Sequence, residues 1–237
     1  MSGRGGDDRG GGADRLQAEI AAAAARLVVE EGAEYAAAKQ RAARDVMQGG
    51  GRRGGRQAEL PGNEQVEDAV REHIAIFFAD EQPEELAALR ALARRWMQRL
   101  AAFRPHLAGA VWRGTATRRS AIHLDLYCDD PKMAEIELIN AGIRFDSASD
   151  EGGAGGRGGR GGRDALYVLS LADRVPGWPE PVTLHLTLRD LDELRGALKP
   201  DARGQTWRGD LAALERRLAE EADGPRHGPA DDAEGRR

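Results

Sequence analysis

The spacing of apolar residues changes partway along this chain of 237 residues, and that change limits which folds are open to it. Up to Phe103, apolar residues recur every three or four positions, which is the period of amphipathic helices. Beyond Ala108, they alternate with polar residues in short runs, which is the period of strands. The sequence therefore predicts an α+β protein: a helical N-terminal region followed by a small mixed β-sheet with helices on one side.

Helices account for most of the predicted structure. Gly32 ends the first of them, and Pro83 begins the fourth with acidic residues in its first turn. Asp210 is expected to cap the last one. The predicted helices are Asp14–Glu31, Glu34–Met47, Glu64–Ala79, Pro83–Phe103, Pro131–Asn140, Leu191–Leu198 and Leu211–Ala222.

Two strands have a clear alternating pattern. In Ala121–Tyr127 the apolar residues Ile122, Leu124 and Leu126 share one face, so His123 and Asp125 fall on the other. Val182–Leu188 alternates in the same way and places His185 on its polar face. The remaining extended segments are predicted at Ala108–Trp112, Ile143–Phe145 and Ala165–Leu171.

Four glycine-rich tracts lack the apolar residues needed to offset chain entropy, and they are predicted to be disordered. They are Met1–Gly12, Gly49–Arg56, Glu151–Arg163 and Asp223–Arg237. The resulting division is a tail at 1–13, a helical region at 14–80, an α+β domain at 83–222 with a Gly/Arg loop at 151–163, and a tail at 223–237. The Gly-Gly-Arg repeats also allow RNA binding, although they lack interleaved aromatic residues.

Composition narrows the classes of protein further. Lys and Arg total 35 against 40 for Asp and Glu, and this formal net charge of −5 argues against a protein that coats nucleic acid. The single Cys128 forms no intramolecular disulfide, and no apolar run reaches the roughly 18 residues of a membrane span. We expect a cytoplasmic protein without a membrane partner. The bias toward Arg, Ala and Gly indicates a GC-rich, bacterial genome.

The segment from Gly109 to Leu126 contains the most informative motif. In the polymerase-beta-like nucleotidyltransferase superfamily, a strand ends in Gly-Ser, a short turn or helix follows, and the next strand carries Asp-x-Asp. Small bacterial members often have an Arg-Gly pair after the Gly-Ser and a Ser before the first Asp. This chain resembles that core, with matching residues at Gly109, Arg113, Gly114, Ser120, Ile122 and Leu124.

The resemblance implies a nucleotide-binding site. Its expected members are Gly109, Arg113, Gly114, Thr115 and Ser120. The neighbouring Arg118 and Arg119 are either further phosphate contacts or solvated charges of the loop.

The residues that would carry catalysis depart from the pattern. Ala110 replaces the Ser of Gly-Ser, and Ala121 and His123 replace the two Asp residues that hold Mg²⁺. One acid remains two positions further along, so Asp125 is the candidate catalytic residue, and Asp125 with His123 is the candidate metal site. Because imidazole is a poor magnesium ligand, Mg²⁺ is a possible cofactor only of a depleted site.

Three hypotheses follow. The domain is a degenerate nucleotidyltransferase that binds a nucleotide, a nucleic-acid end or a protein without doing chemistry, with the N-terminal helices as a possible protein-binding surface. It is alternatively an active, divergent enzyme that uses Asp125 with Asp129 or Asp130. In the third hypothesis the match is accidental, and an unrelated α+β protein supports interaction helices. His123, His185 and Asp125 are also either a zinc site or ordinary strand residues.

Overall fold

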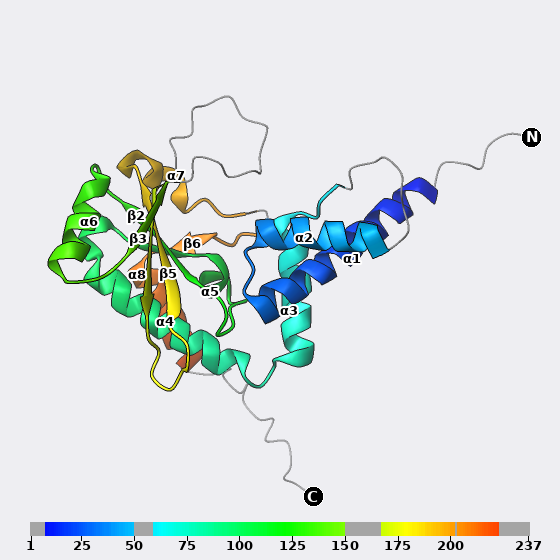
Figure 1. Ribbon diagram of the computed structural model, residues 1–237, viewed down its shortest axis with the longest axis horizontal. Coiled ribbons are helices and arrows are strands. Elements are labelled where there is room, and N and C mark those ends of the chain that lie inside the picture. Colours follow the sequence, from blue (N-terminus) through cyan, green and yellow to red (C-terminus); the bar gives the residue numbers. More distant parts are fainter. Residues whose placement is uncertain (1–7, 50–58, 150–166, 202, 223–237) are drawn as a thin grey trace, which may run out of the picture.

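The computed structural model describes residues 8–49, 59–149, 167–201 and 203–222, with the backbone alone at residues 8–11 and 49. The predicted α+β class is confirmed, since N-terminal helices precede a mixed sheet (Figure 1). Among the described residues, no helix combines the length and the apolar character needed to cross a bilayer. The predicted tracts at Glu151–Arg163 and Asp223–Arg237 lie outside the described residues, as does most of Gly49–Arg56.

The N-terminal region is a group of three helices with its own apolar core. They are α1 (Asp8–Glu31), α2 (Tyr35–Gly49) and α3 (Asn63–Phe77). Ile20 and Ala24 of α1 pack with Ala38 of α2 and Val66 of α3, all of them buried. In Figure 1 these helices form a separate layer beside the sheet.

One prediction about this region is wrong. Residues Asp8–Gly12 are helical, whereas Met1–Gly12 was predicted to be disordered and the helix was predicted to begin at Asp14. Once a helix is nucleated, each added residue costs far less than nucleation does, so a helix can extend through unfavourable glycines. Residues 1–7 of that tract lie outside the described part of the chain.

The strands of the described chain form one six-stranded sheet in the order β3-β4-β5-β2-β1-β6. Strands β2 and β5 run parallel, and the other neighbours are antiparallel. The strands are β1 (His106–Ala108), β2 (Ile122–Tyr127), β3 (Asp146–Ser149), β4 (Tyr167–Asp173), β5 (Val182–Arg189) and β6 (Arg208–Gly209).

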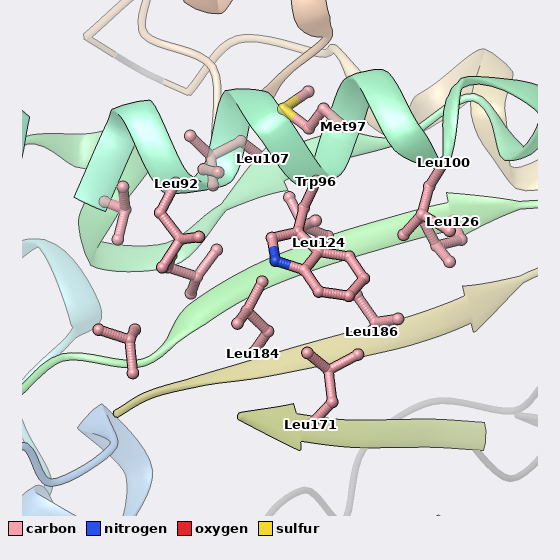
Figure 2. Packing of buried hydrophobic residues seen from close by; sticks show 14 of the residues in the cluster. Leu92, Trp96, Met97, Leu100, Leu107, Leu124, Leu126, Leu171, Leu184 and Leu186 are labelled. Atoms are coloured by element: carbon pink, nitrogen blue, oxygen red, sulfur yellow. The ribbon is translucent and has the colours of Figure 1, made fainter. Parts of the chain in front are cut away.

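A second apolar core lies on one face of this sheet, as the alternation predicted. Leu124 of β2 and Leu186 of β5 are fully buried there beneath α4 (Gln82–Arg99), and Leu214 of α8 (Leu211–Ala222) belongs to the same core. Figure 2 shows Trp96 projecting from α4 toward β2 and β5. Helix α6 (Pro131–Asn140) also packs on the sheet. Strand β5 is followed by a 3₁₀ turn (Leu191–Glu193) and then by α7 (Leu194–Ala197). A further 3₁₀ turn (Ala101–Phe103) links α4 to β1. The opposite face is left for polar residues.

The predicted extended segment Ala108–Trp112 is wrong over most of its length. The strand is His106–Ala108, and Gly109–Arg113 forms the short helix α5. Gly109 has a φ of 67°, a left-handed conformation that turns the chain out of the strand. A short apolar run fits a buried strand and a buried helical turn equally well, so periodicity could not separate them.

Strand β3 lies at Asp146–Ser149, beyond the predicted Ile143–Phe145. The amide of Ile143 instead donates to the carbonyl of Leu138 at 2.9 Å and closes the end of α6, with Gly142 in the left-handed conformation. Strand β6 was missed altogether. Its Arg208 and Gly209 pair with β1, and the predicted cap is also present, since Asp210 accepts a hydrogen bond from the amide of Ala213 at 2.8 Å.

We predict that Leu124→Ala lowers the free energy of unfolding by about 2–5 kcal/mol, because it leaves a cavity in the packed core beneath α4. Leu198→Ala is the matched control, since Leu198 is 45% exposed and should lose far less. Urea unfolding followed by circular dichroism measures both. Equal losses at the two positions would contradict the assignment of this face as the core.

Candidate functional site

A cavity of about 210 Å³ lies where the N-terminal helices meet the polar face of the sheet. Four positions of the sequence motif line it: Gly109, Arg113, Ser120 and His123. The lining also includes Ala110 and Ala121, and it is completed by Val28, Gly32, Ala33, Glu34, Tyr35, Asn63, Glu67 and Trp207. We call this space the interface cavity. The motif residues therefore do meet around one space, but the N-terminal helices build much of its wall.

Gly109 lets β1 and β2 approach closely beside the cavity. A Cβ atom at Gly109 would lie 3.2 Å from the Cδ2 atom of His123. On the other wall, a Cβ atom at Gly32 would lie 2.3 Å from the carbonyl oxygen of Arg119. Gly32 therefore allows the turn between α1 and α2 to press against the loop that leads into β2, which places Glu34 at the cavity.

Arg113 is buried, and its guanidinium group pairs with two carboxylates through Nε and Nη1. Its Nε atom lies 3.1 and 2.9 Å from the two carboxylate oxygens of Glu67 on α3, and its Nη1 atom lies 3.2 Å from Oδ2 of Asp201. The group also lies 4.4 Å from the centre of the Trp207 ring. Burial alone would lower the pKa of Arg113, but the contacts with the two carboxylates raise it overall. Arg113 therefore stays charged.

The two predicted histidines face one another across parallel strands. His123 and His185 are paired in register, with ring centres 5.1 Å apart. His123 contacts Oε1 of Glu34 at 3.0 Å through Nε2, while Nδ1 of His185 lies 2.9 Å from the hydroxyl of Ser170. The contact with His123 lowers the pKa of Glu34, and burial, together with His123, lowers the pKa of His185.

Asp125, the candidate catalytic residue, is held between two arginines. Its Oδ1 atom accepts a hydrogen bond from Nε of Arg189 at 2.9 Å, and its Oδ2 atom lies 2.5 Å from Nη1 of Arg208. Asp125 is only 5% exposed and is not among the residues that line the interface cavity. No group of three or more His, Cys, Asp or Glu residues suited to a metal ion occurs in the described part of the chain.

Two predicted nucleotide-binding residues lie away from the cavity wall. Gly114 ends α5 with a φ of 80°, and its carbonyl accepts from Nε2 of Gln82 on α4 at 3.3 Å. Thr115 is buried, with 1% of its surface exposed. Both residues therefore contribute to the support of α5, and direct contact of either with a ligand stays a prediction.

The alternative candidates occupy other places. Arg118 pairs with Glu85 on α4, and Arg118 and Arg119 line neighbouring depressions, not the interface cavity. Asp130 caps α6 by accepting from the amide of Lys132 at 2.9 Å, while Asp129 is exposed. Neither acid is among the residues that contact Asp125 in the described structure.

Sequence reasoning missed the residues that set the charge of the site. Glu34, Glu67 and Asp201 come from distant segments, as do the two arginines on Asp125. One signal was present for Glu67, which lies between Val66 and Val70 on the apolar stripe of α3. A carboxylate at a core position of a helix predicts a buried partner of opposite charge.

Compared with known protein families, with curated proteins and with solved structures, the chain has no match. The resemblance to nucleotidyltransferases therefore rests on the motif residues alone.

We predict that Glu67→Ala lowers the free energy of unfolding by about 3–5 kcal/mol, because it leaves the charge of Arg113 buried without its main partner. Asp68→Ala is the matched control on the same helix. Asp68 is half-exposed and pairs with Arg203 at the surface, so its loss should be much smaller. Chemical unfolding measures both variants, and similar small losses would show that the buried pair does not hold the two regions together.

We also predict that acid weakens the fold through His185. A histidine whose folded-state pKa is lowered resists protonation in the native state, whereas the unfolded chain takes up a proton below about pH 6.5. The stabilisation is therefore complete above that pH and is lost as the pH falls toward the folded pKa. His185→Gln should flatten the dependence of melting temperature on pH between about 7 and 5. An unchanged slope would contradict this assignment.

Proposed function

We propose that this protein is a nucleotidyltransferase-like domain that binds a nucleotide or the end of a nucleic acid and transfers no nucleotidyl group. The observation that carries the proposal is the meeting of Gly109, Arg113, Ser120 and His123 around the interface cavity. These residues come from α5, from β2 and from the loop before β2. Gly109, Arg113 and Ser120 hold positions to which the motif assigns nucleotide contacts, and His123 holds the position of a metal-binding Asp. The proposal includes a cytoplasmic location.

The absence of transfer follows from the donor set. Magnesium needs hard oxygen ligands, and the motif positions on β2 offer Ala121 and His123. The remaining acid, Asp125, has both oxygens in contact with guanidinium groups. A divalent cation at Asp125 would have to displace at least one arginine and would be repelled by the other. The residues present do not fit magnesium, and we propose binding that does not require it.

A second candidate function is supported by a different surface. Ile76 and Phe77, at the end of α3, are 63% and 64% exposed. Large apolar side chains exposed side by side are typical of protein-binding surfaces. In this alternative the N-terminal helices bind a protein partner and the sheet only supports them.

The test of the main proposal is to fill the cavity. Ala121 lines it and is only partly exposed, so Ala121→Leu should abolish the rise in melting temperature caused by nucleosides, nucleotides or short oligonucleotides. Ala172→Leu, at an exposed position of β4, is the matched control and should keep the response. Circular dichroism checks that both variants fold.

Two results would contradict the proposal. One is an unchanged response in Ala121→Leu, or no response of the unaltered protein to any of these ligands. The other is magnesium-dependent incorporation of labelled nucleotide by the unaltered protein, which would support the active enzyme instead. A protein partner lost on Phe77→Ala, with no nucleotide response, would favour the interaction module.

A further inference from the structure

We propose that the interface cavity selects the unphosphorylated nucleoside over its triphosphate, with amino-bearing bases preferred. This inference rests on the proposed nucleotide-binding function and specifies its ligand. It reverses what a nucleotidyltransferase motif suggests, because the residue placed to contact phosphate is held by carboxylates of the protein itself.

Arg113 has few N–H groups left for a phosphate. A phosphate is recognised by guanidinium N–H groups that are free to donate. Here Nε of Arg113 is shared between both oxygens of Glu67, and Nη1 donates to Asp201, with the side chains of all three residues at most 5% exposed. Glu67 and Asp201 therefore occupy positions around Arg113 that a phosphate would need. A phosphate that bound Nε or Nη1 of Arg113 would have to displace these buried carboxylates, which leaves those charges without partners.

The charge of the cavity wall disfavours anionic ligands. Its ionisable lining consists of two carboxylates, Glu34 and Glu67, and one guanidinium, Arg113, together with His123. Asp201 adds a further negative charge directly behind Arg113. Arg71 also pairs with Glu67, at 2.7 Å. The carboxylates of Glu34, Glu67 and Asp201 still outnumber the guanidinium groups of Arg113 and Arg71. A triphosphate entering this space would be repelled, whereas an uncharged base or nucleoside would not.

The size and shape of the interface cavity suit a small, flat ligand. A cavity of about 210 Å³ is smaller than the pockets of roughly 300–1,000 Å³ that hold drug-sized ligands. Trp207 and Tyr35 give it aromatic surface, on which a base can stack or pack edge-on. This space suits a base and part of its sugar.

The carboxylate of Glu34 favours bases that carry an amino group. Glu34 lies at the rim with its side chain 64% exposed, and one of its oxygens contacts His123. A carboxylate accepts hydrogen bonds from exocyclic amino groups, as acidic side chains do from cytosine in DNA recognition. Adenine, cytosine and guanine carry such a group, and uracil does not. Asn63 and Ser120 add neutral polar contacts to the same wall.

The test is isothermal titration calorimetry of the full chain with adenosine, cytidine, guanosine and uridine, and with the four corresponding 5′-triphosphates. We expect at least one amino-bearing nucleoside to bind about tenfold or more tightly than its triphosphate and than uridine. Raising the salt concentration should weaken this discrimination, because it screens the repulsion of phosphate at the rim.

Two variants locate the effect. Glu34→Gln removes one charge at an exposed position, so it should fold, narrow the ratio between nucleoside and triphosphate, and reduce discrimination against uridine. Glu31→Gln is the matched control, since Glu31 is half-exposed three residues earlier and does not line the interface cavity. Glu67→Gln should raise triphosphate affinity if the variant folds, and the Glu34 comparison stands without it.

Each outcome has a distinct meaning. Triphosphates that bind as tightly as nucleosides, or more tightly, would overturn this inference and leave the proposed nucleotide-binding function intact. Ratios that are the same in Glu34→Gln and in the unaltered protein would overturn the role of the cavity charge. Binding of neither ligand class would overturn the inference, and if short oligonucleotides also fail to bind, the proposed function falls with it.

Discussion

The buried ion pair between Glu67 and Arg113 is the contact on which the arrangement of this molecule depends. It joins α3 of the helical region to α5 of the sheet domain, and Asp201 and Trp207 bring in the segment that leads to β6. Removing charges from water is costly, so such a cluster is favourable only when each member keeps its partners. It therefore fixes one relative placement of the two regions, because any slippage between them would leave charges buried alone.

Close contacts to the backbone, near this ion pair, also hold the helical region against the sheet domain. Arg71 donates to the carbonyl of Arg113 at 2.7 Å, and Thr117 donates to the carbonyl of Val29 at 3.3 Å. Gly32 lies against Arg119 with no room for a side chain. The N-terminal helices thus contact the sheet domain at the same places where its motif residues lie. A ligand site in the interface cavity belongs to both regions, although each has its own apolar core.

Local patterns predicted the elements that local interactions define. The bounds of α6 and α8 were correct because Pro131 and the Asp210 cap fix their first turns, and β5 followed from its strict alternation. Strand β6 could not be predicted, since two residues become a strand only through pairing with β1. The same limit applies to the site. The motif brought Gly109, Arg113, Ser120 and His123 together, but Glu34, Glu67 and Asp201 reach them only through tertiary packing.

Arg189 and Arg208 pair with Asp125, the one acidic residue of β2. Their guanidinium groups bring to this acid the permanent positive charge that a bound cation would supply at a metal site. The charges of these two arginines are paired with a carboxylate inside the protein, as the charge of Arg113 is paired with Glu67. Of the two carboxylates that line the interface cavity, Glu34 is the more exposed, with 64% of its side chain accessible. For the proposed ligand, these ion pairs are in place before it arrives, and Glu34 is the carboxylate that it would meet at the rim.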